Sequence, residues 1–288
     1  MRGTRKSEPR MAELFNVDTV AEASLTDGIR LQRLIDENRV PHTRCRFDLL
    51  TMEAGAELEL DIAETDLTWT QILEGAATLS SDDDEDALGA LHVSFLPPGY
   101  RGKLTSEGGA VLVRLDITNA VAFDPGLNEL DPVAQFFDLS AEPVLQSEHD
   151  ERTRIYVATK KLFGTTALAG ELVIFPAGTA SANHHHVGAE HFQYILRGTG
   201  TVFINETPHR IRPGDLVYKY DGERHYCQND DKEELAFLEF FAPGSWETVW
   251  VDADRSCTWS PTGQNLQGGE ASRHITSHTS DGTVYEDV

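Results

Sequence analysis

The sequence predicts an all-β chain made of two tandem barrels with few short helices. Two observations carry this prediction: one set of glycine turns occurs twice, and the segments between the turns are short, apolar and rich in β-branched and aromatic residues. The 288 residues suffice for two domains of ordinary size. The hydrophobic fraction of 40% is that of a globular protein rather than a disordered one.

The repeat is marked by three glycines in each half of the chain, and every pair is separated by the same 123 residues. The pairs are Gly55 and Gly178, Gly75 and Gly198, and Gly99 and Gly222. Three independent anchors at one offset are not expected by chance, and no gap is needed between the first and the last. The sequence therefore predicts one structural unit that occurs twice.

Strand signals recur about every 8–12 residues in the second half, which is typical of all-β sandwiches and barrels. They cover residues 172–175, 192–196, 201–204, 216–220 and 235–241, and residues 205–207 are expected to form a hairpin turn. The first half repeats the pattern over residues 46–117. Helix signals are thin, and we expect short helices only near residues 26–37 and 131–137.

These signals divide the chain into five segments. We expect an N-terminal tail and lead-in segment at 1–39, a first barrel at 40–120, a linker at 121–150, a second barrel at 151–245 and a C-terminal arm at 246–288. The arm contains apolar anchors such as Trp250 and Trp259 but little periodicity, so we expect it to wrap over a barrel and to fray at its end.

Histidines gather in the second repeat. His184, His185 and His186 are consecutive, His191 follows closely, and His225 comes much later. Imidazole is the commonest ligand of first-row divalent metals. Alternate residues of a strand share a face, so His184 and His186 are expected to point together and His185 away from them.

The histidine stretch resembles the first motif of the cupin superfamily, G-x5-H-x-H-x(3–4)-E-x6-G. Gly178, His184, His186 and Gly198 stand at the matching positions. The resemblance implies tandem cupin barrels, each a double-stranded β-helix or jelly roll. It covers both repeats and is specific for the fold, but it says little about the reaction because this fold hosts many activities.

The second cupin motif, G-x5-P-x-G-x2-H-x3-N, is matched between Gly214 and Asn229. This match supplies Gly222 and His225, while Tyr220 occupies the place where the family usually has proline. The resemblance therefore implies that His225 joins the histidines of the first motif at one metal ion.

One position departs from the first motif. The distance to Gly198 puts His191 where the family has its acid, while Glu190 lies at the alternative spacing from His186. Neighbouring strand residues face opposite sides, so only one of the two can easily reach the metal. We expect the ligands to be His184, His186, His191 and His225, with Glu190 as the alternative to His191.

The first repeat offers no such ligands. The residues 123 positions before the four histidines are Asp61, Ala63, Thr68 and Gly102, and none is a histidine. The sequence therefore predicts a metal site in the second barrel and a metal-free first barrel.

Four neutral histidines would leave the charge of a divalent ion uncompensated. Such a site favours a small, anionic, chelating substrate bound to the metal, for example an enolate, a catecholate or an α-hydroxy acid. Among the metals we favour Fe(II), and zinc, manganese and nickel remain alternatives because imidazole discriminates weakly between them.

Two further residues are candidates for proton transfer. Glu239 interrupts an apolar run on the face of Phe237, and a buried carboxylate there can have a raised pKa suited to a general base; a salt bridge to an arginine is the alternative. Tyr220 is the second candidate. Gln193 and Cys227 share faces with His191 and His225 and are expected to point inward.

The leading functional hypothesis is a non-haem iron dioxygenase, because all-histidine cupin sites resemble those of such oxygenases. The first alternative is a metal-dependent isomerase, cyclase or lyase that uses no O2, with Glu239 or Tyr220 moving the proton. The second alternative is a non-catalytic bicupin that binds metal or a small molecule.

Composition limits the partners. A net charge of −24, which includes the acidic stretch Ser81–Asp86, disfavours nucleic acids and anionic membranes, and no apolar run reaches the length of a membrane span. Three scattered cysteines and the lack of a signal-like N-terminus lead us to expect a cytoplasmic protein with reduced thiols. From the family and the apolar residues of the arm we expect a homo-oligomer.

Overall fold

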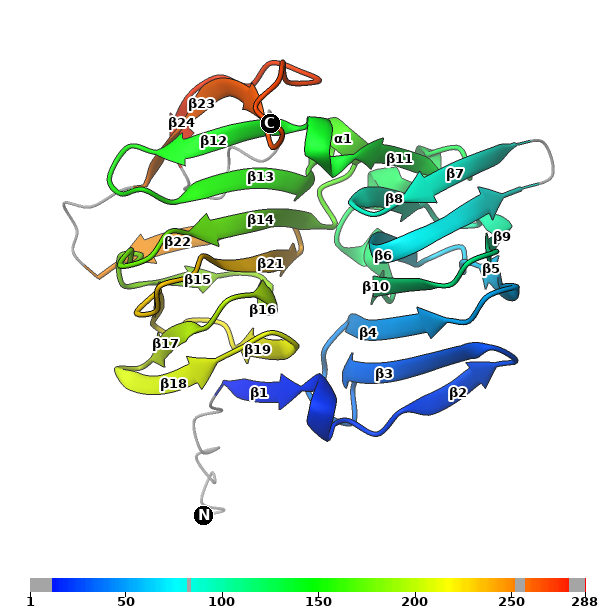
Figure 1. Ribbon diagram of the computed structural model, residues 1–288, viewed down its shortest axis with the longest axis horizontal. Helices are drawn as coiled ribbons and strands as arrows, with labels where there is room; N and C mark the ends of the chain where they lie inside the picture. The colour runs from blue at the N-terminus through cyan, green and yellow to red at the C-terminus, as the bar shows by residue number, and fades with distance from the viewer. Residues whose placement is uncertain (1–11, 82–83, 252–256, 280–287) are drawn as a thin grey trace, which may run out of the picture.

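The computed structural model describes residues 12–81, 84–251, 257–279 and 288. The predicted tail at residues 1–10, together with Asp82 and Asp83 of the acidic stretch, lies outside this part of the chain. The described residues form two β-barrels that lie side by side (Figure 1). None of the helices found in them is long and apolar enough to cross a membrane.

The first half of the chain forms β1 to β10 and the second half forms most of the remaining strands. The bounds are β1 (Glu13–Asn16), β2 (Ala23–Thr26), β3 (Ile29–Ile35), β4 (Cys45–Met52), β5 (Ala56–Asp61), β6 (Leu67–Ser80), β7 (Glu85–Gly89), β8 (His92–Leu96), β9 (Arg101–Ser106), β10 (Ala110–Ile117), β11 (Gln135–Asp138) and β12 (Pro143–Ser147). They continue with β13 (Thr153–Ala158), β14 (Ala169–Phe175), β15 (His184–Val187), β16 (Glu190–Arg197), β17 (Gly200–Ile204), β18 (Thr207–Ile211), β19 (Asp215–Lys219), β20 (His225–Gln228), β21 (Leu235–Ala242), β22 (Glu247–Trp250), β23 (Thr258–Asn265) and β24 (His278–Thr279).

Helices are few. The described residues include one α-helical turn, α1 (Lys160–Phe163), and four 3-10 turns at Val17–Thr19, Ala120–Ala122, Pro125–Glu129 and Leu139–Ala141. The helices expected near 26–37 and 131–137 were wrong, because β3 and β11 occupy these segments. The apolar residues of β3 pack into the first barrel, where pairing with β4 outweighs the local helix preference.

The predicted repeat is confirmed by backbone geometry. The paired glycines have φ angles of 81° and 79° (Gly55, Gly178), 75° and 74° (Gly75, Gly198), and 76° and 78° (Gly99, Gly222). At Gly75 and Gly198 an added Cβ would strike the carbonyl oxygens of Gly109 and Glu234, respectively. Both halves therefore need glycine at this turn for the same two reasons, a left-handed backbone and a close neighbouring strand.

The two barrels exchange strands. β1, which precedes the first barrel, pairs with β19 of the second, and β11, which precedes the second barrel, pairs with β8 of the first. Figure 1 shows β1 beside β19, beneath the second barrel. Each barrel thus has an edge strand covered by a segment that the sequence places next to the other barrel.

A shared aromatic core joins the barrels. Trp69 and Phe47 of the first barrel contact Phe240 of the second, and the rings of Trp69 and Phe240 lie 4.8 Å apart. The indole nitrogen of Trp69 also donates a hydrogen bond to the carbonyl of Val157 at 3.0 Å. Separate apolar clusters fill the two barrels.

Candidate metal centre

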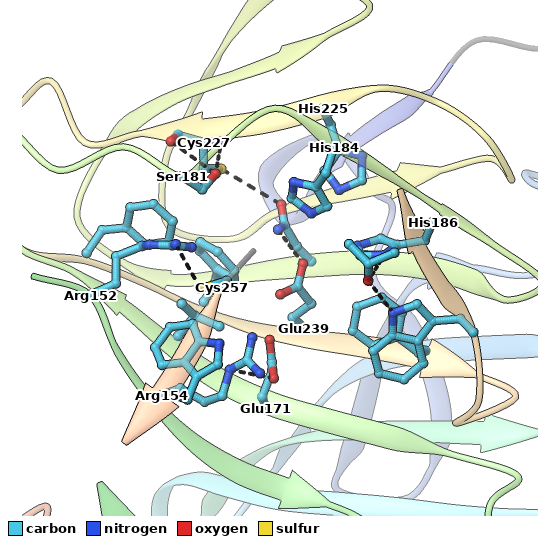
Figure 2. A pocket seen from close by; sticks show the side chains of 18 of the residues that line it. Arg152, Arg154, Glu171, Ser181, His184, His186, His225, Cys227, Glu239 and Cys257 are labelled. Carbon is cyan, nitrogen blue, oxygen red and sulfur yellow. Dashed lines mark hydrogen bonds and ion pairs between the residues drawn. The ribbon is translucent and has the colours of Figure 1, made fainter. Parts of the chain in front are cut away.

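The second barrel encloses a cavity with about 50 Å³ of space for the centres of water-sized molecules. One water needs roughly 10–15 Å³ on this scale, so the cavity has room for a small molecule. Figure 2 shows the side chains around it. They are Arg152, Arg154, Glu171, Val173, Phe175, Ser181, His184, His186, Gln193, His225, Cys227, Phe237, Glu239, Phe241, Trp246, Thr248, Trp250, Cys257 and Trp259.

Three histidines meet at this cavity. His184 and His186 lie on β15 and His225 lies on the neighbouring β20, and each offers a ring nitrogen within 4.8 Å of the others. Over the described residues this is the only group of three or more histidine, cysteine or acidic side chains close enough to hold one metal ion. The two sequence motifs predicted that the histidines of the first motif and His225 of the second motif lie close together.

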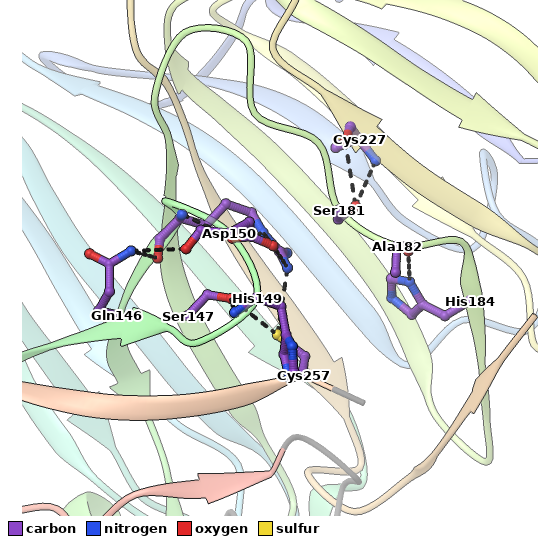
Figure 3. Close-up of polar contacts among 10 residues, drawn as sticks. Gln146, Ser147, His149, Asp150, Ser181, Ala182, His184, Cys227 and Cys257 are labelled. Carbon is purple, nitrogen blue, oxygen red and sulfur yellow. Dashed lines mark hydrogen bonds and ion pairs between the residues drawn. The ribbon is translucent and has the colours of Figure 1, made fainter. Parts of the chain in front are cut away.

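Hydrogen bonds to Nδ1 orient the rings. His184 Nδ1 donates to the carbonyl of Ala182 at 2.8 Å (Figure 3), and His225 Nδ1 donates to that of Glu223 at 2.8 Å. His186 Nδ1 lies 3.2 Å from Thr248 Oγ1. With the proton on Nδ1, the lone pair of Nε2 is left for a metal, as in many protein metal sites.

The donor set fits a divalent cation. His225 Nε2 is buried and has no hydrogen-bond partner in the described part of the chain. An unsatisfied buried acceptor of this kind is costly, and a metal ion at the centre of the triad would satisfy it. Imidazole nitrogens suit first-row divalent ions in general, so the triad does not select one metal.

Burial keeps the histidines neutral. It lowers the pKa of His184 to about 4 and that of His191 to about 3. Burial likewise holds the pKa of His186 and of His225 well below the usual value, and the neighbouring histidines add to the effect. At neutral pH the rings are therefore in the form that binds metals.

His191 lies beside the triad but has another partner. Its Nε2 donates to Glu239 Oε1 at 2.6 Å, and its ring stacks on Phe241 with centroids 4.5 Å apart. The ring centroid is 4.7 Å from that of His186. Coordination through Nε2 would replace the bond to Glu239, so the fourth-ligand role of His191 stays a prediction.

Glu190 faces the other way. Its carboxylate accepts hydrogen bonds from Tyr218 Oη at 2.9 Å, from the backbone N–H of Arg44 at 2.9 Å and from Thr43 Oγ1. Both oxygens are thus engaged at the contact with the first barrel. The alternation of strand faces explains why Glu190 and His191 point to opposite sides.

Glu239 lies between the histidines and a second buried carboxylate (Figure 2). Gln193 Nε2 donates to it at 2.7 Å, in addition to His191. Burial alone would raise its pKa, but His191 and Lys219 oppose this and hold the pKa of Glu239 below its usual value. The expectation of a raised pKa was therefore wrong, and Glu239 is an ionised carboxylate.

Sequence reasoning missed an ion pair beside Glu239. Glu171 of β14 stands directly opposite Glu239 of β21, and its Oε2 lies 2.8 Å from Arg154 Nε. The arginine expected as partner of Glu239 is thus paired with Glu171. Tyr220 does not line this cavity; it lies at a separate depression together with Glu190.

The C-terminal residues supply a wall of the cavity that periodicity did not reveal. β22 pairs with β15 and places Thr248 opposite His186 and Trp250 opposite His184. Trp246 stacks on Phe241 at 3.7 Å. Gln193 and Cys227, in contrast, line the cavity, as the alternation of strand faces predicted.

Comparison with known proteins agrees with this geometry. The cupin domain family matches residues 171–241, which contain all the candidate metal ligands. Residues 171–241 thus form a cupin domain, and this part of the chain contains the histidine triad found among the described residues.

Solved bicupins share the whole architecture. A deletion mutant of Bacillus subtilis oxalate decarboxylase superposes with a TM-score of 0.65 over 87% of this chain and 80% of that one, at 17% identity. The same enzyme at pH 4.6 gives 0.65 over 86% and 80%, at 16% identity. A further structure of it, at 0.65, 16% identity, and coverage of 87% and 81%, is described as containing Mn(II) centres.

A curated relative matches a shorter stretch. The oxalate-binding protein of Thermotoga maritima is 33% identical over 63 residues, which cover 22% of this chain and 52% of that protein. The match spans about half the length of the relative.

Proposed function

We propose that this bicupin is a metal-dependent enzyme that binds a small chelating anion at a divalent ion held by His184, His186 and His225. One observation carries the proposal: three neutral imidazoles, each anchored through Nδ1, meet at a cavity in the second barrel that has room for a small molecule. The relatives named for oxalate support a small carboxylate as ligand, although their low identity or short overlap supports no more than that.

Three groups of residues around the cavity have different proposed roles. A divalent ion bound to the triad supplies Lewis-acid polarisation and, if it is iron, redox chemistry. Phe241, Trp246 and Trp250 exclude water from the cavity. Glu239, ionised and held by His191 and Gln193, is placed to accept a proton from a ligand in the cavity.

For the reaction class we propose a non-haem iron dioxygenase. The neutral donor set supports this because it leaves the charge of the ion to be balanced by a chelating anion. The non-oxidative alternative, a lyase or isomerase with manganese, zinc or nickel, is favoured by one observation: an ionised carboxylate, Glu239, already stands beside the cavity as a base.

Elemental analysis of protein purified without added metal tests the site. Wild type is compared with His225→Ala, and His185→Ala serves as the matched control because it sits between two ligands on the same strand but does not line the cavity. We expect about one equivalent of metal per chain in wild type and His185→Ala and almost none in His225→Ala. Equal metal in all three proteins, or none in any after reconstitution, contradicts the proposal.

O2 uptake separates the two reaction classes. Iron-loaded wild type is assayed with diphenols, gentisate-like acids and diketones, and with oxalate as a non-oxidative probe followed by CO2 release. Uptake that stops in His225→Ala supports the dioxygenase. No uptake across the panel, with turnover by the manganese-loaded protein, favours the lyase. Stoichiometric metal without any turnover would leave the non-catalytic binding role.

A further inference from the structure

Lys219 is a buried cation that the metal-centre description leaves unexplained. Its side chain is fully enclosed, with 1% of the residue exposed at the end of β19. Within the described residues its Nζ has no hydrogen-bond partner. A buried ammonium without a partner is strongly unfavourable, so a retained one indicates a role at a ligand site.

The lysine belongs to the inner wall of the second barrel. It stands opposite His191 in the pairing of β19 with β16, and it shares its strand face with Val217, which packs inside the barrel. Its charge acts on all four histidines, lowering the pKa of each. Lys219 is thus next to the metal centre.

The two carboxylates that act on Lys219 accept hydrogen bonds from groups other than this lysine. The nearest acidic influence is Glu239, whose Oε1 accepts from His191 and Gln193. Glu223 accepts from the backbone N–H groups of Ala12 and Tyr220. Burial lowers the pKa of Lys219 to about 8, which leaves it mostly protonated at neutral pH.

The other buried charges near the centre have close partners. Arg152 lies 2.7 Å from Asp150 and Arg154 lies 2.8 Å from Glu171, and Glu171 also forms a hydrogen bond with Glu239. A divalent ion would therefore add positive charge beside a buried ammonium group, where uncompensated charge is costly.

We propose that Lys219 makes this centre selective for small dianions over monoanions of the same shape. The proposal rests on the metal site proposed above and assigns Lys219 as the specificity-determining residue. Its ammonium group adds one buried positive charge beside the ion, so a ligand with two negative charges is favoured more than a ligand with one. A neutral side chain at this position removes that charge and reduces the preference.

Oxalate and oxamate provide a matched pair of probes. Both are small planar chelators with the same number of heavy atoms, but at pH 7 oxalate carries two negative charges and oxamate carries one. Affinities are measured by calorimetry with the metal-loaded protein, and metal content is determined on the same samples. The variants are Lys219→Met, which removes the charge at similar length, and Lys219→Arg, which keeps it. Lys232→Met, at an exposed lysine, is the control.

We expect wild type, Lys219→Arg and Lys232→Met to bind oxalate at least about tenfold more tightly than oxamate. In Lys219→Met the ratio should fall by about tenfold or more while metal content stays at one equivalent.

An unchanged oxalate-to-oxamate ratio in metal-loaded Lys219→Met would overturn the assignment and leave the metal site intact. Loss of metal from wild type itself is a different failure, since it removes the proposed function on which the assignment rests.

Discussion

The same hydrogen bond occurs at the centre of both barrels with different residues. In the first barrel Thr68 Oγ1 donates to Asp116 Oδ1 at 2.5 Å, and in the second His191 Nε2 donates to Glu239 Oε1 at 2.6 Å. Each partner in the second barrel lies 123 residues after its counterpart. A buried carboxylate that accepts from the neighbouring strand is therefore part of the repeated unit itself, and it occurs with and without a metal site.

A second carboxylate repeats as well, since Glu171 lies 123 residues after Asp48. What differs is the counter-charge. In the first barrel Arg33 binds Asp48 through two hydrogen bonds, and Arg46 and Arg114 both bind Asp116. In the second barrel Arg154 accompanies Glu171, and Glu239 has His191 and Gln193 as its hydrogen-bond donors.

The comparison shows how one scaffold can be either inert or equipped for metal. In the first barrel guanidinium groups pair with both buried carboxylates. Burial alone would raise the pKa of Asp116, but Arg114 and Arg46 overcome this and lower it. The second barrel replaces that fixed charge with neutral imidazoles, which leaves room for an exchangeable cation and an anion bound to it.

The largest expected difference between the two barrels is their stability at acidic pH. In metal-free protein the folded pKa of His191 is about 3, below its unfolded value near 6.5, so the unfolded chain binds the proton first. The contribution of neutral, buried His191 to the stability of the folded protein is complete above pH 6.5 and is lost as the pH falls toward 3. At pH 4 the loss from His191 alone is about 3 kcal/mol, and the other histidines add to it.

Hydrogen exchange of metal-free protein at pH 7 and pH 4, corrected for intrinsic rates, measures this difference. We expect β16 and β20 to lose protection and β6 and β9 to keep it, because Thr68 does not titrate and the lowered pKa of Asp116 keeps it ionised at pH 4. Equal loss in both barrels would mean that the shared core makes them open together.

Removing the Asp116 carboxylate of the first barrel should lower the free energy of unfolding by nearly as much. Asp116→Asn leaves Arg46 and Arg114 near each other without their counter-charge. Breaking a buried ion pair costs about 3–5 kcal/mol, and partial exposure of Arg46 favours the lower end, about 3 kcal/mol. Denaturant unfolding measures it, with metal content expected to stay unchanged.

Asp61→Asn is the matched control for this variant, because the Arg101–Asp61 pair is on the surface, with 76% of each side chain exposed. Its removal should cost less than about 1 kcal/mol. If Asp116→Asn is as mild as Asp61→Asn, the arginines do not need the carboxylate, and the view of the first barrel as a charge-balanced core is incorrect.

Chelation should destabilise the second barrel only. An ion present at about 100 times its dissociation constant stabilises the folded protein by about 2.7 kcal/mol. We expect a chelator to lower the free energy of unfolding of wild type by about this amount and to leave His225→Ala unchanged. A chelator effect of the same size in His225→Ala would place the metal outside the triad.

The repeat explains why much of this architecture could be predicted from the sequence. Glycine turns with a left-handed backbone, such as Gly75 and Gly198, admit few other residues, so their spacing is a direct record of the fold. The triad was predictable for a similar reason, because a metal needs specific ligand atoms at positions fixed by the strand alternation.

Other features left no local signal. Exchange of β1 and β11 depends on contacts between distant segments, and periodicity does not report the partner of a strand. Charged residues such as Glu171 and Lys219 look like surface positions in a single sequence, although both are buried. The repeat offset, applied to acidic residues as well as to glycines, would have found Glu171 and Glu239 through Asp48 and Asp116.

Glu190→Gln should have the smallest effect and tests which neighbour belongs to the metal centre. The change removes the charge of a carboxylate that accepts from Tyr218, Arg44 and Thr43, and we expect it to cost about 1–2 kcal/mol in denaturant unfolding. Metal content should stay at one equivalent because Glu190 faces the first barrel. His191→Gln, on the opposite face, is the counterpart and should weaken metal retention in a competition with chelator. The reverse result, in which Glu190→Gln loses metal and His191→Gln keeps it, would require β16 to turn its other face to the ion, and the correspondence between Thr68 and His191 would then not extend to the metal-bound protein.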